Sequence, residues 1–293
     1  MTNAPIVSVI IPTFNAASYV ANAVDSALAS REVNVEVIVV DDGSTDDTWL
    51  LLDDFDKQVR RMRQNHGGPY RARNLAAREA KGEWLAFLDA DDEWLPDKLM
   101  KQLARADDST NLIYTDCMNF GDIDRLTELQ SDSVKLFEGD IFEPLLLGNF
   151  IPLSSVLIRK SVFEELGGFS VERIGIGDWD FWLRYAASGG LVGLCREPLT
   201  RYRCHSGQIS RDLDQRAADR EAVLRRALLL PKGQQVSRHI ARQAFANVWA
   251  IGAWRAAAEN RSKAIRWYLR AAFYWPWKLQ LYKEIIKCCI GRV

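Results

Sequence analysis

Three apolar runs in the first hundred residues each end abruptly in polar residues. They span residues 7–11, 36–40 and 84–88, and the polar residues behind them are 12–15, 41–44 and 89–92. Short apolar runs without strict alternation are typical of strands that are buried on both faces of a sheet. Apolar spacing of i, i+4 and i+8 predicts an amphipathic helix over about residues 18–29, and a second helix over about residues 70–80 follows a glycine loop.

Further elements continue this alternation of strands and helices. Residues 59–63 give a weaker strand signal, and Pro96 suits the first turn of a helix. Ser44 with Asp47 resembles a capping box, which would open a helix toward Phe55. Repeated β-α-β units predict an α/β fold with a mostly parallel, Rossmann-like sheet flanked by helices.

The pattern is looser after about residue 110. We expect short strands over residues 112–114 and 155–158, a mobile loop over the polar residues 122–132, and helices that end at Gly167 and that span about 179–187. From residue 213 onward the chain is helical in character and has no strand signal.

The carboxylates of Asp89, Asp91 and Asp92 follow the third apolar run directly. Ligands bind at the carboxyl ends of strands in open α/β sheets, and clustered carboxylates repel one another unless a cation lies between them. Oxygen ligands suit Mg²⁺ or Mn²⁺, which usually bind to proteins through one or two carboxylates plus substrate phosphates. The sequence therefore predicts an enzyme that handles a metal–diphosphate substrate.

Six short motifs, in this order, resemble those of the family 2 glycosyltransferases, which have the GT-A fold. They lie at residues 7–15 (VSVIIPTFN), 39–46 (VVDDGSTD), 87–92 (FLDADD), 167–169 (GGF), 177–184 (GDWDFWLR) and 202–205 (YRCH). The resemblance covers about residues 5–210. It implies a GT-A domain over residues 1–212, followed by a basic helical region over residues 213–293. It also implies an inverting, metal-dependent transfer from a nucleoside-diphosphate sugar to an acceptor hydroxyl, as in cell-surface polysaccharide or glycolipid synthesis.

The motifs behind the first two strands are expected to bind the nucleotide. Pro12, Thr13, Phe14 and Asn15 can border a base-sized slot, although a plain turn would account for Pro12 and Asn15 alone. Asp42 is placed to accept hydrogen bonds from a nucleobase or a ribose hydroxyl, and the resemblance implies contact with the base. A lone Asp-Gly pair is usually only a turn.

Asp89 and Asp91 form a DxD motif. The resemblance implies that Asp91 is the direct metal ligand and that Asp89 contacts the ribose or the water shell of the metal. His205 matches a histidine of the family near the diphosphate, where imidazole can ligate the metal or donate to a phosphate. Asp92 is interpreted as a cap of the following helix. Arg71, behind the glycine loop, could reach a phosphate, although arginines on helices are commonly solvated.

Asp178 is the candidate catalytic base, because inversion by direct displacement needs a carboxylate that takes the proton of the acceptor hydroxyl. The family usually has Glu-Asp at this point, whereas this chain has Gly177 before Asp178. That departure removes one carboxylate from the acceptor site and leaves open whether Asp178 or Asp180 is the base. Asp180 could equally cap the helix, and Trp179 and Trp182 could line the acceptor pocket or pack in the core.

The charge is divided unevenly along the chain. Residues 1–200 contain 19 Lys+Arg against 33 Asp+Glu, and residues 201–293 contain 19 against 6. Together with many Trp and Tyr residues, this excess is typical of helices that lie on an anionic membrane surface. The basic region could equally dock on the acidic part of the chain, with its aromatics in a helical core. No recognisable nucleic-acid-binding module accompanies the charge, so no nucleic acid is expected.

Location can be predicted from what the sequence lacks. No apolar stretch reaches the roughly 18–20 residues of a membrane span, and no basic segment precedes the first apolar run. The five cysteines are scattered without a CxxC pair, which indicates reduced thiols. We therefore predict a cytoplasmic protein, with peripheral attachment to the inner face of the cell membrane as a hypothesis and a lipid-linked or saccharide acceptor.

Other functions of α/β proteins are less consistent with these motifs. A nucleotidyltransferase or a dinucleotide dehydrogenase needs a glycine-rich loop after the first strand, and residues 12–15 contain no glycine. A non-catalytic sugar-nucleotide-binding or membrane scaffold protein derived from this fold stays open. The missing Glu before Asp178 is the feature that favours it.

Overall fold

The structure is a computed structural model, which describes residues 6–55, 57–122, 127–172, 176–205 and 213–290. The chain divides into two units. Unit 1 comprises residues 1–141, 150–181 and 189–207, and unit 2 comprises residues 142–149, 182–188 and 208–293. The boundary that the sequence analysis places between residues 212 and 213 adjoins residues 206–212, which lie outside the described part.

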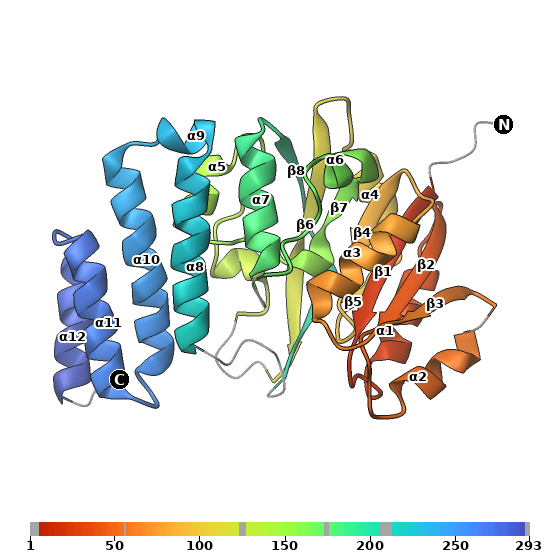
Figure 1. The fold of residues 1–293 in the computed structure, drawn as a ribbon, viewed down its shortest axis with the longest axis horizontal. Coiled ribbons are helices and arrows are strands. Elements are labelled where there is room, and N and C mark those ends of the chain that lie inside the picture. The colour runs from red at the N-terminus through yellow and green to blue at the C-terminus, as the bar shows by residue number, and fades with distance from the viewer. Residues whose placement is uncertain (1–5, 56, 123–126, 173–175, 206–212, 291–293) are drawn as a thin grey trace. The chain divides into compact units, whose positions relative to one another are not determined.

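A mixed sheet forms the centre of unit 1 (Figure 1). Among the described residues its strand order is β3-β2-β1-β4-β7-β6-β8-β5. The strands are β1 (Ile6–Thr13), β2 (Asn34–Asp41), β3 (Val59–Arg63), β4 (Trp84–Phe87), β5 (Glu93–Trp94), β6 (Thr110–Gly121), β7 (Leu157–Arg159) and β8 (Leu191–Cys204).

The first four strands are parallel to one another, as the β-α-β pattern predicts. β7 then runs antiparallel to both β4 and β6, β6 and β8 are parallel, and β5 is antiparallel to β8. The predicted α/β fold is confirmed, and its second half is mixed. Parallel order at β1, β2 and β4 brings the three polar segments behind these strands to one edge of the sheet.

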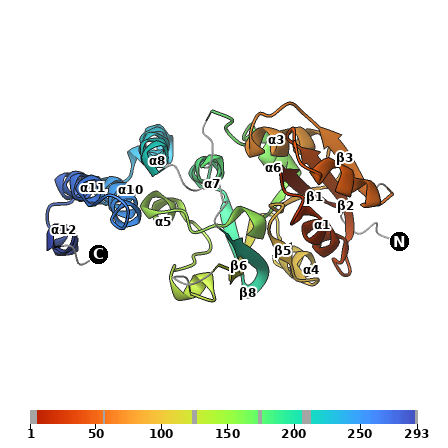
Figure 2. The same ribbon diagram turned by 90° about the horizontal axis from the view of Figure 1, so that it is seen from below.

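Helices cover both faces of this sheet (Figure 2). On one face, α1 (Val20–Leu28) and α4 (Lys98–Leu103) lie over an apolar core, in which Val20 and Val24 are fully buried with Val9 and Ile11 of β1. On the other face lie α3 (Pro69–Glu79) and α6 (Lys160–Glu165). The remaining helical segments of unit 1 are α2 (Thr48–Leu51), η1 (Leu52–Phe55), η2 (Gln130–Asp132) and η3 (Leu153–Ser155). Helix α7 (Gly177–Ala187) begins in unit 1 and ends in unit 2.

Several local predictions are wrong. β1 continues through Pro12 to Thr13, because the parallel pairing with β2 extends to that end. Ser44 forms no capping box with Asp47: its hydroxyl accepts from the backbone N–H of Asn15, and α2 begins only at Thr48. β6 has twelve residues instead of the expected three.

β8 has no counterpart among the expected strands, and part of the predicted loop has regular structure. β8 mixes buried, half-exposed and exposed positions without a regular period and carries several arginines, so it lacks a continuous apolar run. Of the predicted mobile loop, residues 123–126 lie outside the described part. Beyond them, Leu129 forms a bridge to Met118 of β6, and η2 follows.

Unit 2 is helical, as predicted for the C-terminal extension. Its elements besides the end of α7 are α5 (Phe142–Leu147), α8 (Leu213–Leu229), α9 (Pro231–Gln234), α10 (Arg238–Ala256), α11 (Arg261–Tyr274) and α12 (Leu279–Ile290). α10 packs against α5, α8 and α11, and α12 packs on α11. Small residues allow close packing: a Cβ atom on Gly252 would lie 2.8 Å from the ring of Trp267.

A buried carboxylate joins three helices of unit 2. Glu221 of α8 is 7% exposed and accepts hydrogen bonds from Trp249 Nε1 at 2.9 Å, Arg270 at 3.0 Å and Arg225 at 2.5 Å. The Arg270 guanidinium also lies 3.7 Å from the centre of the Trp249 ring. Since a buried charge is tolerated only when it is paired, this cluster fixes the relative placement of α8, α10 and α11. None of the helices among the described residues is both long and apolar enough to cross a membrane.

Candidate active site

The loops behind β1 and β2 are tied together by side-chain hydrogen bonds. Asn15 adopts a left-handed backbone conformation with φ of 49°, and its N–H donates to Ser44 Oγ at 2.9 Å. Its side-chain oxygen accepts from the N–H of Thr45 at 2.8 Å. Asn15 therefore has a structural role at this edge. Pro12 and Thr13 are buried at the end of β1, so of the four predicted nucleotide-binding residues only Phe14 and Asn15 are exposed.

Phe14 lies beside a histidine that the sequence analysis left without a role. Its ring centre is 4.3 Å from that of His66, and Phe14 is 44% exposed. His66 Nδ1 lies 3.0 Å from Asp42 Oδ2. The two exposed rings form an aromatic edge of the kind on which a nucleobase can stack. The position of His66 directly before the glycine loop is the signal that could have identified it.

Asp42 holds the glycine loop in place. Its carboxylate oxygens accept hydrogen bonds from the N–H groups of Gly67 and Gly68, both at 2.8 Å, and from Gln64 Nε2 at 2.6 Å. Gly68 has φ of 90°, a conformation that favours glycine. Asp42 therefore fixes the entry into α3. Its predicted contact with a nucleobase stays a prediction.

On α3, a different arginine from the predicted one contacts the DxD motif. Arg73 is buried and forms an ion pair with Asp89. Arg71 is exposed and lies over the loop, where a Cβ atom on Gly67 would be 2.6 Å from its Cδ. Arg73 falls three residues after the buried Tyr70 and three before the buried Ala76. That spacing places it on the inward face of the helix and could have identified it from the sequence.

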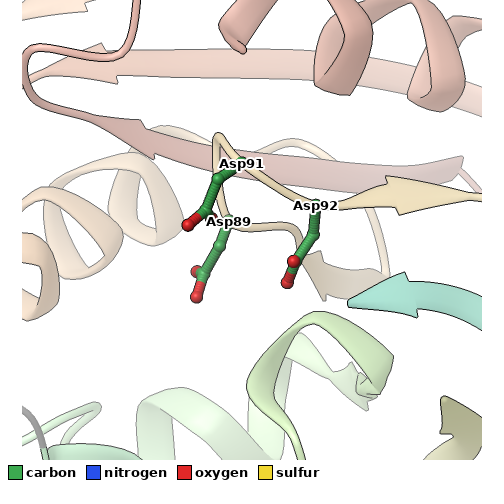
Figure 3. A group of neighbouring side chains, drawn as sticks. All are labelled: Asp89, Asp91 and Asp92. Atoms are coloured by element: carbon green, nitrogen blue, oxygen red, sulfur yellow. The ribbon is translucent and has the colours of Figure 1, made fainter. Parts of the chain in front are cut away.

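The three carboxylates behind β4 converge. One oxygen from each of Asp89, Asp91 and Asp92 lies within 4.8 Å of the others, and the side chains leave the loop on the same side (Figure 3). Burial raises the pKa of Asp91, and the nearby charge of Asp89 raises it further. His205 Nε2 lies 2.9 Å from Asp91 Oδ2 and opposes this shift. The cluster brings together Asp89, Asp91 and His205, as the motif order predicts.

Asp92 does not cap the following helix, so that interpretation is wrong. Its carboxylate accepts from the N–H of Arg203 in β8 at 2.8 Å and from Ser154 Oγ at 2.5 Å. Burial raises its pKa well above the usual range. Ser154 Oγ also accepts from the N–H of Asp89 at 3.0 Å, so η3 supports the loop behind β4. Ser154 is 65 residues away in sequence and no local pattern marks it.

This donor set fits a hard divalent cation. Both oxygens of Asp92 are engaged by the protein, which leaves Asp91 and Asp89 as the carboxylates able to bind a metal. Oxygen ligands with one imidazole suit Mg²⁺ or Mn²⁺, which complete their shells with water and phosphate oxygens. The raised pKa of Asp91 also favours a cation at this site, since a cation would stabilise carboxylates that otherwise repel each other.

Asp178 lies in the first turn of α7 and meets α3. Tyr70 donates a hydrogen bond from its hydroxyl to Asp178 Oδ1 at 2.8 Å. Asp178 itself is partly exposed, whereas the neighbouring Trp179 and Asp180 are 3% and 5% exposed. Exposure therefore favours Asp178 over Asp180 as the group that can meet an acceptor, and burial of Trp179 favours packing over a lining role.

The fold and the acidic cluster define a glycosyltransferase of the GT-A class. Glycosyl transferase family 2 matches residues 8–167, and the chain belongs to this family. It is 28% identical over 211 residues to the E. coli protein named UDP-Glc:alpha-D-GlcNAc-diphosphoundecaprenol beta-1,3-glucosyltransferase WfaP, a match that covers 70% of this chain and 80% of that protein. Uncharacterised glycosyltransferases of Rickettsia felis and Rickettsia conorii are 30% identical over 69% of the chain, which spans only 33% of their length.

Solved structures share the fold. S. aureus TarS, residues 1–349 in complex with UDP-GlcNAc, superposes with a TM-score of 0.69 at 17% identity, covering 92% of this chain and 80% of that one. The mannosyltransferase PcManGT of Pyrobaculum calidifontis, in complex with GDP-Man and Mn²⁺, gives 0.61 at 19% identity, covering 99% and 88%. At such identities the likeness shows a shared fold and no more. The predicted GT-A architecture is thereby confirmed.

Proposed function

We propose that the chain is an inverting, metal-dependent glycosyltransferase that moves a sugar from a nucleoside-diphosphate sugar to an acceptor hydroxyl. One observation carries the proposal: Asp89 and Asp91 converge behind β4, with Arg73 on one and His205 on the other. Family membership and the donor-sugar complexes of the two similar structures support it.

The donor is bound along the strand edge. The base stacks at the aromatic edge of Phe14 and His66, next to the loop that Asp42 fixes. The diphosphate meets the Asp91 side of the cluster, where His205 donates to a phosphate oxygen and the exposed Arg71 can approach. Asp91 would hold a divalent ion directly, and Asp89 would contact the ribose or the water bound to that ion; when bound, the ion would supply positive charge that stabilises the departing diphosphate.

Asp178 takes the proton from the acceptor hydroxyl. In a single displacement the acceptor oxygen attacks the anomeric carbon from the face opposite the leaving diphosphate, and that bond forms as the sugar–phosphate bond breaks. The hydroxyl proton must leave at the same time, so a carboxylate on the acceptor side is required. Asp178 is the partly exposed carboxylate at the start of α7, which suits this task.

The acceptor class is argued by likeness to WfaP, whose name gives a diphosphoundecaprenol acceptor. A lipid-linked saccharide would present its hydroxyl at a membrane surface. We therefore assign donor binding and chemistry to the domain over residues 1–212 and placement at the membrane to residues 213–293.

One face of α12 suits such a surface. Leu279, Ile286 and Ile290 are 73%, 58% and 59% exposed, and their spacing of seven and four residues places them on one stripe. Lys283 and Lys287 border the stripe. An apolar stripe with cations along one edge is typical of helices that lie in the interface of an anionic bilayer, so we propose this face as a peripheral attachment site.

A non-catalytic sugar-nucleotide-binding scaffold is the second candidate, because Gly177 replaces the expected Glu beside Asp178. The deciding experiment compares the unchanged chain with Asp178→Asn. Nucleoside diphosphate release from UDP-glucose, UDP-GlcNAc and GDP-mannose with Mn²⁺ is measured, with water in place of the acceptor hydroxyl, together with the thermal shift produced by UDP and GDP. A catalyst loses turnover in Asp178→Asn and keeps the thermal shift. A scaffold shows the shift with no turnover in either protein.

A further inference from the structure

Tyr70 connects the helix on the donor side with the carboxylate on the acceptor side. It lies in the first turn of α3, is 7% exposed, and donates to Asp178 Oδ1 at 2.8 Å across 108 residues of sequence. The Arg73 guanidinium lies 5.2 Å from the centre of its ring, and the ring of Phe169 lies 5.4 Å away. The phenol is therefore held by packing on two sides.

The ring of Tyr70 also explains why a glycine precedes Asp178. A Cβ atom on Gly177 would lie 2.9 Å from Tyr70 Cδ2 and 2.9 Å from the backbone oxygen of Ser170. Real Cβ atoms do not approach other atoms this closely, so a larger residue at position 177 would displace the tyrosine or the backbone. Tyr70 thus occupies the space beside Asp178 that a side chain at position 177 would need.

We propose that Tyr70 is a positioning residue for Asp178, which holds the carboxylate in place for proton transfer through a donated hydrogen bond. The inference rests on the proposed function, in which Asp178 is the base. It goes beyond that function by assigning a polar partner of the base to α3.

The chemistry of the pair suits this role. Burial and the neighbouring Asp178 charge raise the pKa of Tyr70 well above its usual range, so the phenol stays protonated and donates. A hydrogen bond donated to a carboxylate favours its ionised form, which is the form that accepts a proton. Fixing one carboxylate oxygen also limits side-chain rotation, and small displacements of a reacting group lower rates strongly.

The same helix contacts the donor side at two further points. Asp42 holds the N–H groups of Gly67 and Gly68 at its start, and Arg73 pairs with Asp89 one turn later. One turn of α3 therefore links the glycine loop beside the proposed nucleobase site, the DxD motif and Asp178.

The test is Tyr70→Phe, which keeps the ring against Gly177 and removes only the hydroxyl. Nucleoside diphosphate release from UDP-glucose, UDP-GlcNAc and GDP-mannose with Mn²⁺ gives kcat and KM, and the thermal shift with UDP and GDP reports the donor site. We expect kcat to fall about tenfold, the effect of losing one hydrogen bond, while KM for the donor and the thermal shift stay unchanged.

Tyr114→Phe is the matched control. Tyr114 is a buried tyrosine of β6 in the same unit, and its hydroxyl donates to the backbone oxygen of Phe137 at 2.7 Å. It should lose stability and keep kcat. Wild-type kcat in Tyr70→Phe, or an equal loss of kcat in Tyr114→Phe, would overturn the positioning role while the proposed function stands. No turnover by the unchanged chain would overturn the proposed function and this role with it.

Discussion

The guanidinium of Arg73 is paired with the carboxylate of Asp89, and this pair joins α3 to the loop behind β4. The Arg73 side chain is 5% exposed and that of Asp89 is 33% exposed. Arg73 therefore neutralises the carboxylate from inside the protein, while Asp89 keeps an accessible side. The pair sets the direction in which Asp89 can offer its remaining oxygen.

Arg73→Gln should weaken both the fold and nucleotide binding. Removing one partner of a buried pair costs about 3–5 kcal/mol, and the partial exposure of Asp89 reduces this to about 2 kcal/mol. With Asp89 no longer fixed, affinity for UDP with Mn²⁺ should fall about tenfold, as is usual when a supporting contact to a metal site is lost. Urea unfolding and titration calorimetry measure the two effects.

Arg78→Gln is the control for this variant. Arg78 is exposed in the last turn of the same helix, so its replacement should change stability by less than about 0.5 kcal/mol and leave affinity unchanged. If Arg73→Gln bound UDP and Mn²⁺ as tightly as the unchanged protein, the pair would have no role in orienting Asp89.

Asp91→Asn should abolish the metal-dependent part of nucleotide binding. In the unchanged protein, UDP with Mn²⁺ at about 100 times its Kd should add about 2.7 kcal/mol of stability, which EDTA should remove. Loss of the charged ligand should make the melting temperature of Asp91→Asn insensitive to EDTA. Asp54→Asn replaces an exposed carboxylate of η1 and should keep the full response. A metal-dependent shift that survives in Asp91→Asn would exclude Asp91 as the ligand.

How much of the fold could be predicted depended on where each strand is buried. β1, β2 and β4 are buried on both faces, so their apolar runs were sufficient. β8 was missed because Arg201 and Arg203 interrupt it, and both are paired with Glu93, more than a hundred residues earlier in sequence. Such a partner stabilises a partly buried charge on a strand, and partners that distant leave no local pattern.

The residues of the site also differ in whether a local sequence pattern marks them. Asp89, Asp91 and His205 could be proposed because each stands in a motif of fixed order. Ser154 and Tyr70 could not, since each acts by contacting a residue far away in sequence. Supporting contacts of this kind depend on tertiary packing, whereas the motif residues are marked by their neighbours.

Lys98→Met should stabilise the protein most at low pH. Lys98 is fully buried, with its Nζ 2.9 Å from Gln102 Oε1 and 3.9 Å from the centre of the Trp94 ring, and burial lowers its pKa to about 7. The unfolded chain binds this proton more tightly between pH 7 and the ordinary lysine pKa of about 10.4, so stability rises with pH across that window. From pH 6 to pH 8.5 the gain from this group is about 2 kcal/mol.

The difference in the free energy of unfolding between Lys98→Met and the unchanged protein should therefore decrease by about 2 kcal/mol between pH 6 and pH 8.5. Urea unfolding at the two pH values measures it. Lys101→Met, on the same helix, removes a lysine that is paired with Glu197 at the surface. Its difference in stability from the unchanged protein should not decrease between pH 6 and pH 8.5. A difference that is constant with pH would mean that Lys98 stays charged in its buried position.

The α12 face should bind anionic vesicles and ignore neutral ones. Binding is measured by sedimentation with vesicles of phosphatidylglycerol. The double variant Lys283→Glu with Ile286→Glu removes a cation and places a charge in the apolar stripe. Each cation at such a surface contributes about 1 kcal/mol, and the loss of apolar insertion adds to this, so binding should fall at least tenfold. Raising the salt concentration should also weaken the binding of the unchanged protein to these vesicles.

Leu50→Glu is the control, because Leu50 is an exposed leucine of α2 in unit 1 and lies outside the proposed surface. It should leave vesicle binding unchanged, and turnover of soluble donors should be equal in all three proteins, because the residues proposed for the chemistry lie in unit 1. Equal binding to phosphatidylcholine vesicles would contradict an electrostatic contribution. If the α12 variant instead lowered the oligomer mass in light scattering, with no effect on vesicles, the stripe would be an interface between copies of the chain.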